Sequence, residues 1–447
     1  MTTLQSATAG TQWQDGLWLV GGCVRDQLLG LPAGSDLDIV LEGDAVELAS
    51  FLFAQGICDH APVCYPRFGT AMVIIAGKQF EFVQARAESY DEDSRKPVVQ
   101  PATLKDDAFR RDFTVNTLMQ NLHTGEILDL TGRGRQDLAN RLLITPLPPD
   151  ETFIDDPLRM LRAVRFRHKL DFEPDPTMWA SIRVHAERLK IISAERIQQE
   201  WLKMLVGPRP ASAMRDLREL YLLEQFAPEL LAMVGVEQGR YHHLDVWDHT
   251  LLVLENLQTD DPVLALAAIF HDIGKPATRM IDDEGQTRFF GHESVGAKMT
   301  STILHRLKFS NAEIVAVVKL VRHHMRLGSA PTFTPTAARR VIRDLEDDTD
   351  RLLTLVDADV RALAPGVKTM DIGVIADQIE RVRRVTPAPK LRSPLSGEEI
   401  MRILEVEPGV AVGKAKEWLT EQVIEGRLEP DDADSARRML STEYKPN

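Results

Sequence analysis

The first third of the chain alternates short apolar runs with turns. Between residues 17 and 130 these runs are LWLVGG, LDIVLEG, TAMVIIAG, FEFVQAR and GEILDL. Apolar runs of this length, bounded by glycine and polar residues, are typical of strands, and the stretch 45–55 between two of them is typical of a helix. The pattern therefore predicts an α+β or α/β domain built on a small sheet.

From Pro157 to the end the pattern becomes almost wholly helical. The segments DPLRMLRAVRFRHKL and AERIQQEWLKML repeat apolar residues every three or four positions, as amphipathic helices do. Breaks rich in proline and glycine at 206–211, 364–368 and 386–397 indicate joints between helical units.

The length and composition set the broad class of the protein. A chain of 447 residues is too long for one core, so roughly two to four domains are expected. No apolar run is long enough to span a bilayer, and the polar segment 1–16 does not resemble a secretory signal. Cys23, Cys58 and Cys64 are odd in number and lack metal-binding spacing, so we expect reduced thiols in a cytoplasmic protein without membrane contact.

The net charge of −14 does not decide whether the chain binds nucleic acid. Between residues 132 and 205 there are 13 Lys and Arg against 11 Asp and Glu, a local net charge of +2. Because phosphate binding depends on the local field, the charge balance neither demands nor excludes a nucleic-acid partner.

Two acids stand one residue apart at the start of the run GSDLDIVLEG. Residues i and i+2 of a strand point to the same face, so Asp36 and Asp38 would lie side by side, which is costly without a cation. Two such carboxylates can bind Mg²⁺ for phosphoryl transfer, and Glu81 is the best candidate for a third. The alternatives are a turn with two capping acids and, for Glu81, a solvated strand position.

A pair of glycines precedes these acids in LVGGCVRDQLLG. Gly21 and Gly22, between a strand and a helix, would let backbone N–H groups approach phosphates closely. Arg25, in the first turn of that helix, could hold a triphosphate oxygen. A simple strand-to-helix turn would explain the glycines equally well.

A second set of candidate ligands lies in the helical half. Imidazole and carboxylate groups on several helices can enclose a divalent ion, and an adjacent His-Asp pair after a buried apolar helix is unusual without a metal. The candidates are His249, His271, Asp272, His292, His323, His324, Asp357 and Asp359.

The first group of motifs resembles the nucleotidyltransferase head of the class II tRNA nucleotidyltransferase and bacterial poly(A) polymerase family, which includes the CCA-adding enzymes. RRDFTVNTL at 110–118 is similar to the element that closes the family's nucleotide pocket. The resemblance implies that Arg111, Asp112 and Asn116 bind triphosphate and sugar, with Asn116 near the ribose.

The segment DDPLRMLRAVRF at 155–166 resembles the family element that reads the incoming base. The resemblance implies that Asp156 and Arg159 form a protein template, since an acceptor and a donor can meet the edge of cytosine or adenine. The family usually has Glu where this chain has Asp155. Arg162 and Arg165 either contact nucleotide or tRNA phosphates or form a solvated stripe on the same helix face.

The segment SYDEDSRKPVVQPATLKD at 89–106 resembles the loop that the family uses when it switches from C to A. Family members that stop after CC tend to have this loop shortened, so its full length here implies a capacity to add the terminal A. A mobile surface loop of no special function is the alternative.

The second set of candidates resembles the HD phosphohydrolase superfamily. The resemblance implies that His249, His271, Asp272 and Asp359 hold a divalent metal whose identity is open. His292 and His324 are similar to outer histidines that hold a second metal or a phosphate. Phosphodiesterase or phosphatase activity on damaged tRNA ends would follow.

These expectations combine into an α+β nucleotidyltransferase head with a small mixed sheet at 1–140, an all-α neck and body at 141–240, an all-α HD domain at 241–365 and a helical tail at 366–447. The implied reaction is attack of a tRNA 3′-hydroxyl on CTP or ATP with Mg²⁺ in the head. The alternatives are an A-adding enzyme or poly(A) polymerase of the same family, an HD phosphohydrolase with an RNA-binding head, and a non-catalytic tRNA-binding scaffold.

Overall fold

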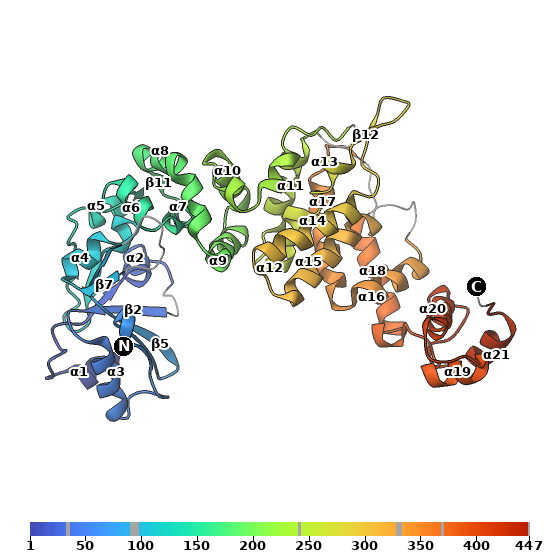
Figure 1. Ribbon diagram of the computed structural model, residues 1–447, viewed down its shortest axis with the longest axis horizontal. Helices are drawn as coiled ribbons and strands as arrows, with labels where there is room; N and C mark the ends of the chain where they lie inside the picture. Colours follow the sequence, from blue (N-terminus) through green and yellow to red (C-terminus); the bar gives the residue numbers. More distant parts are fainter. Residues whose placement is uncertain (33–35, 90–97, 240–242, 328–332, 368–370, 446–447) are drawn as a thin grey trace. The chain divides into compact units, whose positions relative to one another are not determined.

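The computed structural model describes the chain in two compact units, Met1–Pro228 and Glu229–Asn447 (Figure 1). The described residues are 1–32, 36–89, 98–239, 243–327, 333–367 and 371–445. The division after Pro228 falls within the expected neck and body, and the four-part division of the chain stays a prediction.

Within the described residues, the first unit is built on a seven-stranded sheet with the order β3-β4-β5-β2-β1-β8-β9. Strands β2 and β5 pair in parallel and their neighbours pair antiparallel, so the sheet is mixed as expected. Each apolar run noted in the sequence contains a strand, whereas β3 and β8 are short and were not predicted. The bounds are β1 Trp18–Val20, β2 Asp36–Leu41, β3 Val63–Tyr65, β4 Thr70–Ile75, β5 Lys78–Gln84, β8 Met119–Asn121 and β9 Ile127–Leu128.

One face of the sheet is covered by helix α3 (Ala45–Ala54), which packs on β4 and β5. The strand residues on this face are apolar and buried, with Ile39, Phe80 and Phe82 at most 1% exposed. Because strand side chains alternate, the residues between them, including Glu81, point to the face that α3 leaves uncovered.

Helix α4 (Leu104–Phe109) partly covers the face of the sheet opposite α3. Ala108 of α4 packs with Val20, Val40 and Met119 in a buried apolar cluster. Val40 lies two residues beyond Asp38 on the same strand face, so this cluster fixes α4 beside the acids.

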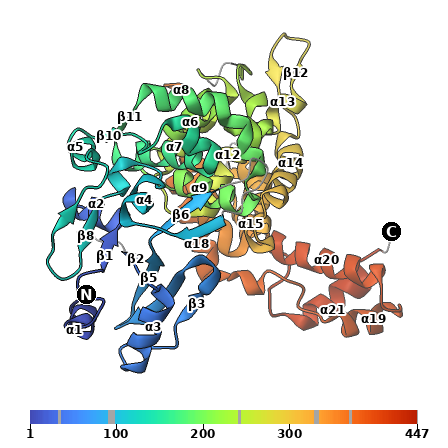
Figure 2. The same cartoon turned by 60° about the vertical axis from the view of Figure 1, so that its left-hand side comes forward.

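The rest of the first unit is mainly helical (Figure 2). The two amphipathic helices predicted from the sequence are confirmed as α7 (Leu158–Leu170) and α9 (Ala194–Leu205), which pack on each other and on α10. The other elements are α1 Thr2–Thr8, α2 Gly22–Leu28, β6 Arg86–Ser89, β7 Val98–Pro101, α5 Gly134–Ala139, β10 Leu142–Leu143, α6 Pro149–Asp155, β11 Glu173–Pro174, α8 Pro176–His185 and α10 Pro210–Glu219.

The second unit is helical apart from a short hairpin, β12 (Met280–Ile281) with β13 (Thr287–Arg288). Helix α12 (Pro262–Phe270) is buried from Val263 onward on all sides and therefore lies at the centre of its unit. No helix in the described ranges is long and apolar enough to cross a membrane. The remaining helices are α11 Val246–Leu257, α13 Lys275–Thr278, α14 His292–Arg306, α15 Asn311–His323, α16 Pro335–Leu345, α17 Thr349–Arg361, α18 Ile372–Val385, α19 Gly397–Leu404, α20 Val410–Glu425 and α21 Ala433–Thr442.

The alternation on β5 leads to a stability prediction. Truncating Phe82→Ala removes a fully buried ring under α3 and should cost about 3–5 kcal/mol of unfolding free energy. Gln79→Ala, on the exposed face of the same strand, should change it by less than about 0.5 kcal/mol. Native-state amide exchange of β2 and β5 measures both changes, and equal losses would contradict the assignment of faces.

Candidate active site and candidate metal centre

Two acids meet across the parallel strands of the sheet. Asp38 on β2 is the direct Cα partner of Glu81 on β5, and Asp36 is the partner of Gln79. Partners in this register point to the same face, which is the one that α3 leaves uncovered. The structure therefore brings Asp38 and Glu81 together as the sequence suggested, while the side chain of Asp36 lies outside the described part.

The glycine turn after β1 lies directly beside Asp38. Gly21 has a φ of +78°, which an L side chain rarely adopts, and it precedes helix α2. A Cβ at Gly21 would lie 3.8 Å from Asp38 Oδ2 and 3.7 Å from Arg111 Nη1. The backbone of this turn therefore lies beside both Asp38 and Arg111. Gly22 is the first residue of helix α2.

Arg25 of α2 points into the protein rather than into an open site. Its side chain is 2% exposed, donates to Asp26 and to Asn116 Oδ1 at 2.6 Å, and lies 5.0 Å from the ring centre of Phe166. In the structure Arg25 is hydrogen-bonded to Asn116. Contact between Arg25 and a triphosphate stays a prediction.

Asp112 is a buried carboxylate whose charge is compensated by Arg162. Arg162 donates to Asp112 Oδ2 through Nε at 2.8 Å and Nη2 at 2.5 Å, and Asn116 Nδ2 donates to Oδ1 at 2.9 Å. Burial alone would raise the pKa of Asp112, but Arg162 and Asn116 outweigh it and lower the pKa to about 2. Asp112 therefore stays ionised and orients the Asn116 amide.

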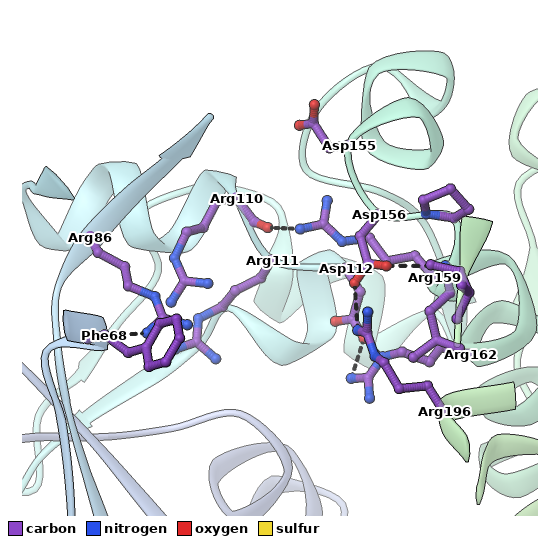
Figure 3. Close-up of a pocket in the computed structure, with 13 residues that line it drawn as sticks. Phe68, Arg86, Arg110, Arg111, Asp112, Asp155, Asp156, Arg159, Arg162 and Arg196 are labelled. Atoms are coloured by element: carbon purple, nitrogen blue, oxygen red, sulfur yellow. Dashed lines mark hydrogen bonds and ion pairs between the residues drawn. The ribbon is translucent and has the colours of Figure 1, made fainter. Parts of the chain in front are cut away.

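A cavity of about 450 Å³ lies between the arginines of the RRDF segment and the start of α7 (Figure 3). Five of the candidate nucleotide-binding residues line it, namely Arg111, Asp112, Asp156, Arg159 and Arg162. The described lining residues are Phe68, Arg86, Arg110, Arg111, Asp112, Asp155, Asp156, Pro157, Leu158, Arg159, Arg162, Ile192 and Arg196.

The predicted base-reading pair lies in this cavity at the junction between α6 and α7. Asp156 Oδ1 accepts from the Leu158 amide at 3.1 Å, and Oδ2 accepts from Arg196 Nη2 at 3.1 Å. Arg159 is 7% exposed and donates to the Thr152 and Arg110 carbonyls at 3.3 and 2.5 Å. Both side chains are thus held in fixed positions at the cavity wall.

Arg165 does not line the cavity, and the interpretation of a solvated stripe is wrong for it. Its side chain is only 10% exposed, donates to Glu200 Oε2 at 2.5 Å and lies 4.2 Å from the ring centre of Phe166. Phe166 also lies 5.3 Å from the Arg162 guanidinium and packs edge-on against Phe113. The Phe166 ring therefore packs against the guanidinium groups of Arg25, Arg162 and Arg165. The sequence did not predict this shared contact.

Several other cavity residues were missed by sequence reasoning. Arg110 and Arg196 stand inside quoted motifs, RRDFTVNTL and AERIQQEWLKML, and could have been found there. Arg86 ends the quoted strand run FEFVQAR, and its Nη1 donates to the Phe68 carbonyl at 2.9 Å. The segment 89–106 contains the end of β6, strand β7 and the start of α4, and residues 90–97 lie outside the described part.

In the second unit, four histidines surround one buried aspartate. Asp272 follows α12 and is 1% exposed. Its Oδ2 lies 3.1 Å from His271 Nε2 and 3.7 Å from His249 Nε2, and its Oδ1 lies 3.4 Å from His292 Nε2 and 3.8 Å from His324 Nε2. Two groups with ligand atoms within 4.8 Å result, and they share Asp272.

Backbone carbonyls fix the tautomer of three of these histidines. The Nδ1 atoms of His271, His292 and His324 lie 2.8, 2.8 and 2.7 Å from the carbonyl oxygens of Ala268, Phe289 and Val321. A carbonyl only accepts, so each Nδ1 carries a proton and each ring directs its Nε2 toward Asp272. This is the arrangement that metal-binding histidines need.

Charges in this cluster favour a cation. Burial raises the pKa of Asp272, but His271 and Lys275 hold it well below its usual range. Burial and neighbouring His271 lower the pKa of His324 to about 3, so it is neutral. Burial lowers the pKa of His271, but Asp272 and Asp359 outweigh it and raise that pKa. An ionised carboxylate surrounded by imidazole nitrogens is a donor set that fits a divalent metal.

The structure also separates the two candidate aspartates of α17. Asp359 Oδ1 lies 2.9 Å from His249 Nε2 and 3.9 Å from His271 Nε2. Asp357 instead pairs with Arg361 at 3.0 Å and its side chain is 49% exposed. Asp359 is thus the one positioned beside the histidines.

The Asp112–Arg162 pair yields a pH prediction. The pKa of Asp112 is lowered from 3.8 to about 2, so its stabilising effect is present above pH 4 and disappears as the pH falls toward 2. Asp112→Asn should therefore reduce unfolding free energy by about 2 kcal/mol at pH 7 and by much less near pH 2.5. Amide exchange of α7 at both pH values measures this, and a pH-independent difference would contradict it.

Comparisons with known proteins agree with this architecture. Residues 17–144 match the poly A polymerase head domain, 171–233 match a probable RNA and SrmB-binding site of polymerase A, and 239–363 match the HD domain.

Two curated relatives match nearly the whole chain. The chain is 33% identical to a CC-adding tRNA nucleotidyltransferase of Thermus thermophilus, over 92% of this chain and 90% of the relative. It is also 33% identical to an A-adding tRNA nucleotidyltransferase of Deinococcus radiodurans, over 91% of each. The crystal structure of a Bacillus stearothermophilus CCA-adding enzyme in complex with CTP shares the fold, with a TM-score of 0.70 and 22% identity over 98% of this chain and 95% of that one. The chain therefore belongs to the tRNA nucleotidyltransferase and poly(A) polymerase family and carries the family's head, an RNA-binding segment and an HD domain.

Proposed function

We propose that the chain adds C and A residues of the CCA end to the 3′ end of tRNA, taking CTP and ATP without a nucleic-acid template and releasing pyrophosphate. One observation carries this proposal. Asp38 and Glu81 stand together beside Gly21 and Arg111, and Arg111 also lines the arginine-rich cavity. Acids, an open backbone turn and a cationic cavity are the parts that nucleotidyl transfer needs.

The paired acids of β2 and β5 would hold Mg²⁺. Carboxylate oxygens are the ligands that Mg²⁺ prefers, and like charges on neighbouring strands are costly without a cation, so Asp38 and Glu81 fit the ion, with Asp36 as the third ligand. When bound, Mg²⁺ neutralises charge on the attacking and leaving oxygens of an in-line displacement.

The arginines and Asn116 would bind the rest of the nucleotide. Arg111 lies beside both Gly21 and Asp38 and can therefore contact phosphates near the acids. Asn116 is held by Arg25 through Oδ1 and by Asp112 through Nδ2, which fixes the amide for contact with the ribose.

The base would be read by Asp156 and Arg159 at the opposite side of the cavity. Arg159 has five N–H groups, of which its bonds to the Thr152 and Arg110 carbonyls use two. Each Asp156 oxygen can accept a second hydrogen bond beyond those from Leu158 and Arg196. A donor and an acceptor thus remain for the base edge, which explains selection without a guide strand.

Solved relatives support tRNA as the partner. The structure of a Thermotoga maritima CCA-adding enzyme in complex with tRNA has a TM-score of 0.57 to this chain. The match covers 98% of this chain and 93% of the other. Backbone phosphates would supply most of the affinity, so tRNA binding should weaken as salt rises. Equal identity to a CC-adding and an A-adding relative leaves both additions open to the assay described next.

The nucleotide test uses purified chain with tRNA lacking the whole CCA end and tRNA ending in CC, each with one labelled nucleotide. We expect CMP incorporation into the first and AMP incorporation into the second. AMP incorporation alone would identify an A-adding enzyme or a poly(A) polymerase, and CMP incorporation alone a CC-adding enzyme. No incorporation of either would contradict the proposal.

The acid pair is tested by Asp38→Asn. Loss of the metal ligand should lower the addition rate at least about a hundredfold, since metal-ion catalysis supplies several kcal/mol. Glu126→Gln, an exposed acid of the same unit, is the matched control and should leave the rate unchanged. If Asp38→Asn retains full activity, the metal assignment is wrong.

We also propose a metal-dependent phosphodiesterase or phosphatase activity in the second unit, which would repair damaged tRNA ends. The observation that favours it is the pair of His–Asp groups that share Asp272. His249, His271, Asp272 and Asp359 would hold one divalent ion. The Nε2 atoms of His292 and His324 lie 3.2 Å apart and would hold a second, together with Asp272.

Metal content tests this centre. After equilibration with Mn²⁺ and dialysis, the chain should retain about two ions, His324→Ala about one, and Asp272→Asn close to none. Asp357→Asn, outside the cluster, is the control and should retain both. Mass spectrometry of the metal measures this, and full retention by Asp272→Asn would exclude the shared site. Hydrolysis of 2′,3′-cyclic nucleotides should fall in parallel.

A further inference from the structure

Asp107 is a fully buried acid behind the cavity, outside every motif considered above. It lies on α4 with 0% exposure, next to Ala108, which fixes the helix to the sheet. An ionised carboxylate in such a place is costly unless it is fully hydrogen-bonded. Two arginines supply those bonds.

Each oxygen of Asp107 receives one guanidinium side-on. Oδ1 accepts from Arg110 Nε at 2.9 Å and Nη2 at 2.5 Å, and Oδ2 accepts from Arg111 Nε at 3.0 Å and Nη2 at 2.8 Å. Side-on bonding of this kind fixes the plane of a guanidinium. It leaves the Nη1 atom of Arg111 on the side away from Asp107, where a Cβ built on Gly21 would lie 3.7 Å from it.

The charge count makes this arrangement suited to an anion. One carboxylate holds two guanidinium groups, which leaves one positive charge uncompensated by Asp107. Among the described lining residues of the cavity, six arginines stand against three aspartates. Two of those aspartates, Asp112 and Asp156, are bonded to Arg162 and Arg196. On the Asp107 side, Arg110 and Arg111 share the one carboxylate of Asp107.

We infer that Asp107 is a positioning residue that holds Arg110 and Arg111 as a clamp for the triphosphate of the incoming nucleotide. The inference rests on the proposed nucleotidyl transfer and deepens it. The backbone of Arg110 also contacts the base-reading side, because its carbonyl accepts from Arg159 Nη2 at 2.5 Å. In Figure 3, Arg110 and Arg111 extend toward Phe68 and Arg86, across the cavity from Arg162 and Arg196.

The test compares binding of CTP and CMP to the full chain. Asp107→Asn should weaken CTP binding about tenfold, as expected for loss of a charge-assisted contact, and leave CMP binding within about twofold. KM for CTP should rise by a similar factor with a smaller change in kcat. Asp106→Asn is the matched control, because Asp106 is exposed and bonds only within the Thr103 capping box among the described contacts.

A double-mutant cycle separates positioning from simple support. If Asp107 acts through Arg111, adding Asp107→Asn to Arg111→Gln should cost less CTP affinity than it does alone. Additive losses, equal weakening of CTP and CMP, or unchanged CTP binding would overturn the inference. If Asp107→Asn does not fold, Arg111→Gln alone must still weaken CTP and spare CMP, and failure to do so overturns it as well.

The outcome also distinguishes this inference from the proposed function. A wild-type chain that neither binds CTP nor incorporates nucleotide contradicts the proposed function itself. A wild-type chain that is active, with Asp107→Asn indistinguishable from it, contradicts only the role of Asp107.

Discussion

The parallel pairing of β2 with β5 is the constraint on which the head depends. In this register Asp38 lies opposite Glu81 and Ile39 lies opposite Phe82, so a single alternation separates an acidic face from an apolar one. Helix α3 packs on the apolar face, so the acids lie on the opposite face of the sheet. A shift by one residue would bury the acids and expose the phenylalanines, so the hydrophobic effect that stabilises the sheet also fixes the position of the acids.

Beyond the sheet, the cavity is organised by carboxylates that are buried together with arginines. Asp107, Asp112 and Glu200 are each at most 7% exposed, and each binds at least one guanidinium. Removing one partner of such a pair leaves a buried charge unpaired, which makes these contacts rigid supports rather than adjustable ones. The wall of the cavity around Arg110, Arg111 and Arg162 is therefore held in place by buried ion pairs.

Sequence patterns predicted five strands of the large sheet and the main helices, because these follow from local periodicity. The sequence marks Glu81 as the best candidate for a third carboxylate, but its place opposite Asp38 depends on the long-range pairing of β2 with β5. Sequence patterns did not predict which arginines face inward. Arg25 bonds to Asn116 and packs on Phe166, which are both far away in the chain. Arg159 bonds to the Arg110 carbonyl and Arg165 bonds to Glu200, so the partners of these arginines also lie on other elements. Asp106 has a local signature, since Thr103 and Asp106 have the spacing of a capping box, but nothing local marks Asp107 as buried, because only tertiary packing buries it.

The two candidate sites reach opposite electrostatic states by opposite means. In the head, arginines outnumber the acids of the cavity, and the excess positive charge suits a triphosphate. In the second unit, backbone carbonyls hold the Nδ1 atoms of three histidines, so their Nε2 atoms point toward Asp272, which supplies negative charge together with Asp359. Such a centre attracts cations and would repel free phosphate. The proposed hydrolysis of phosphate esters therefore requires metal ions that reverse the local charge.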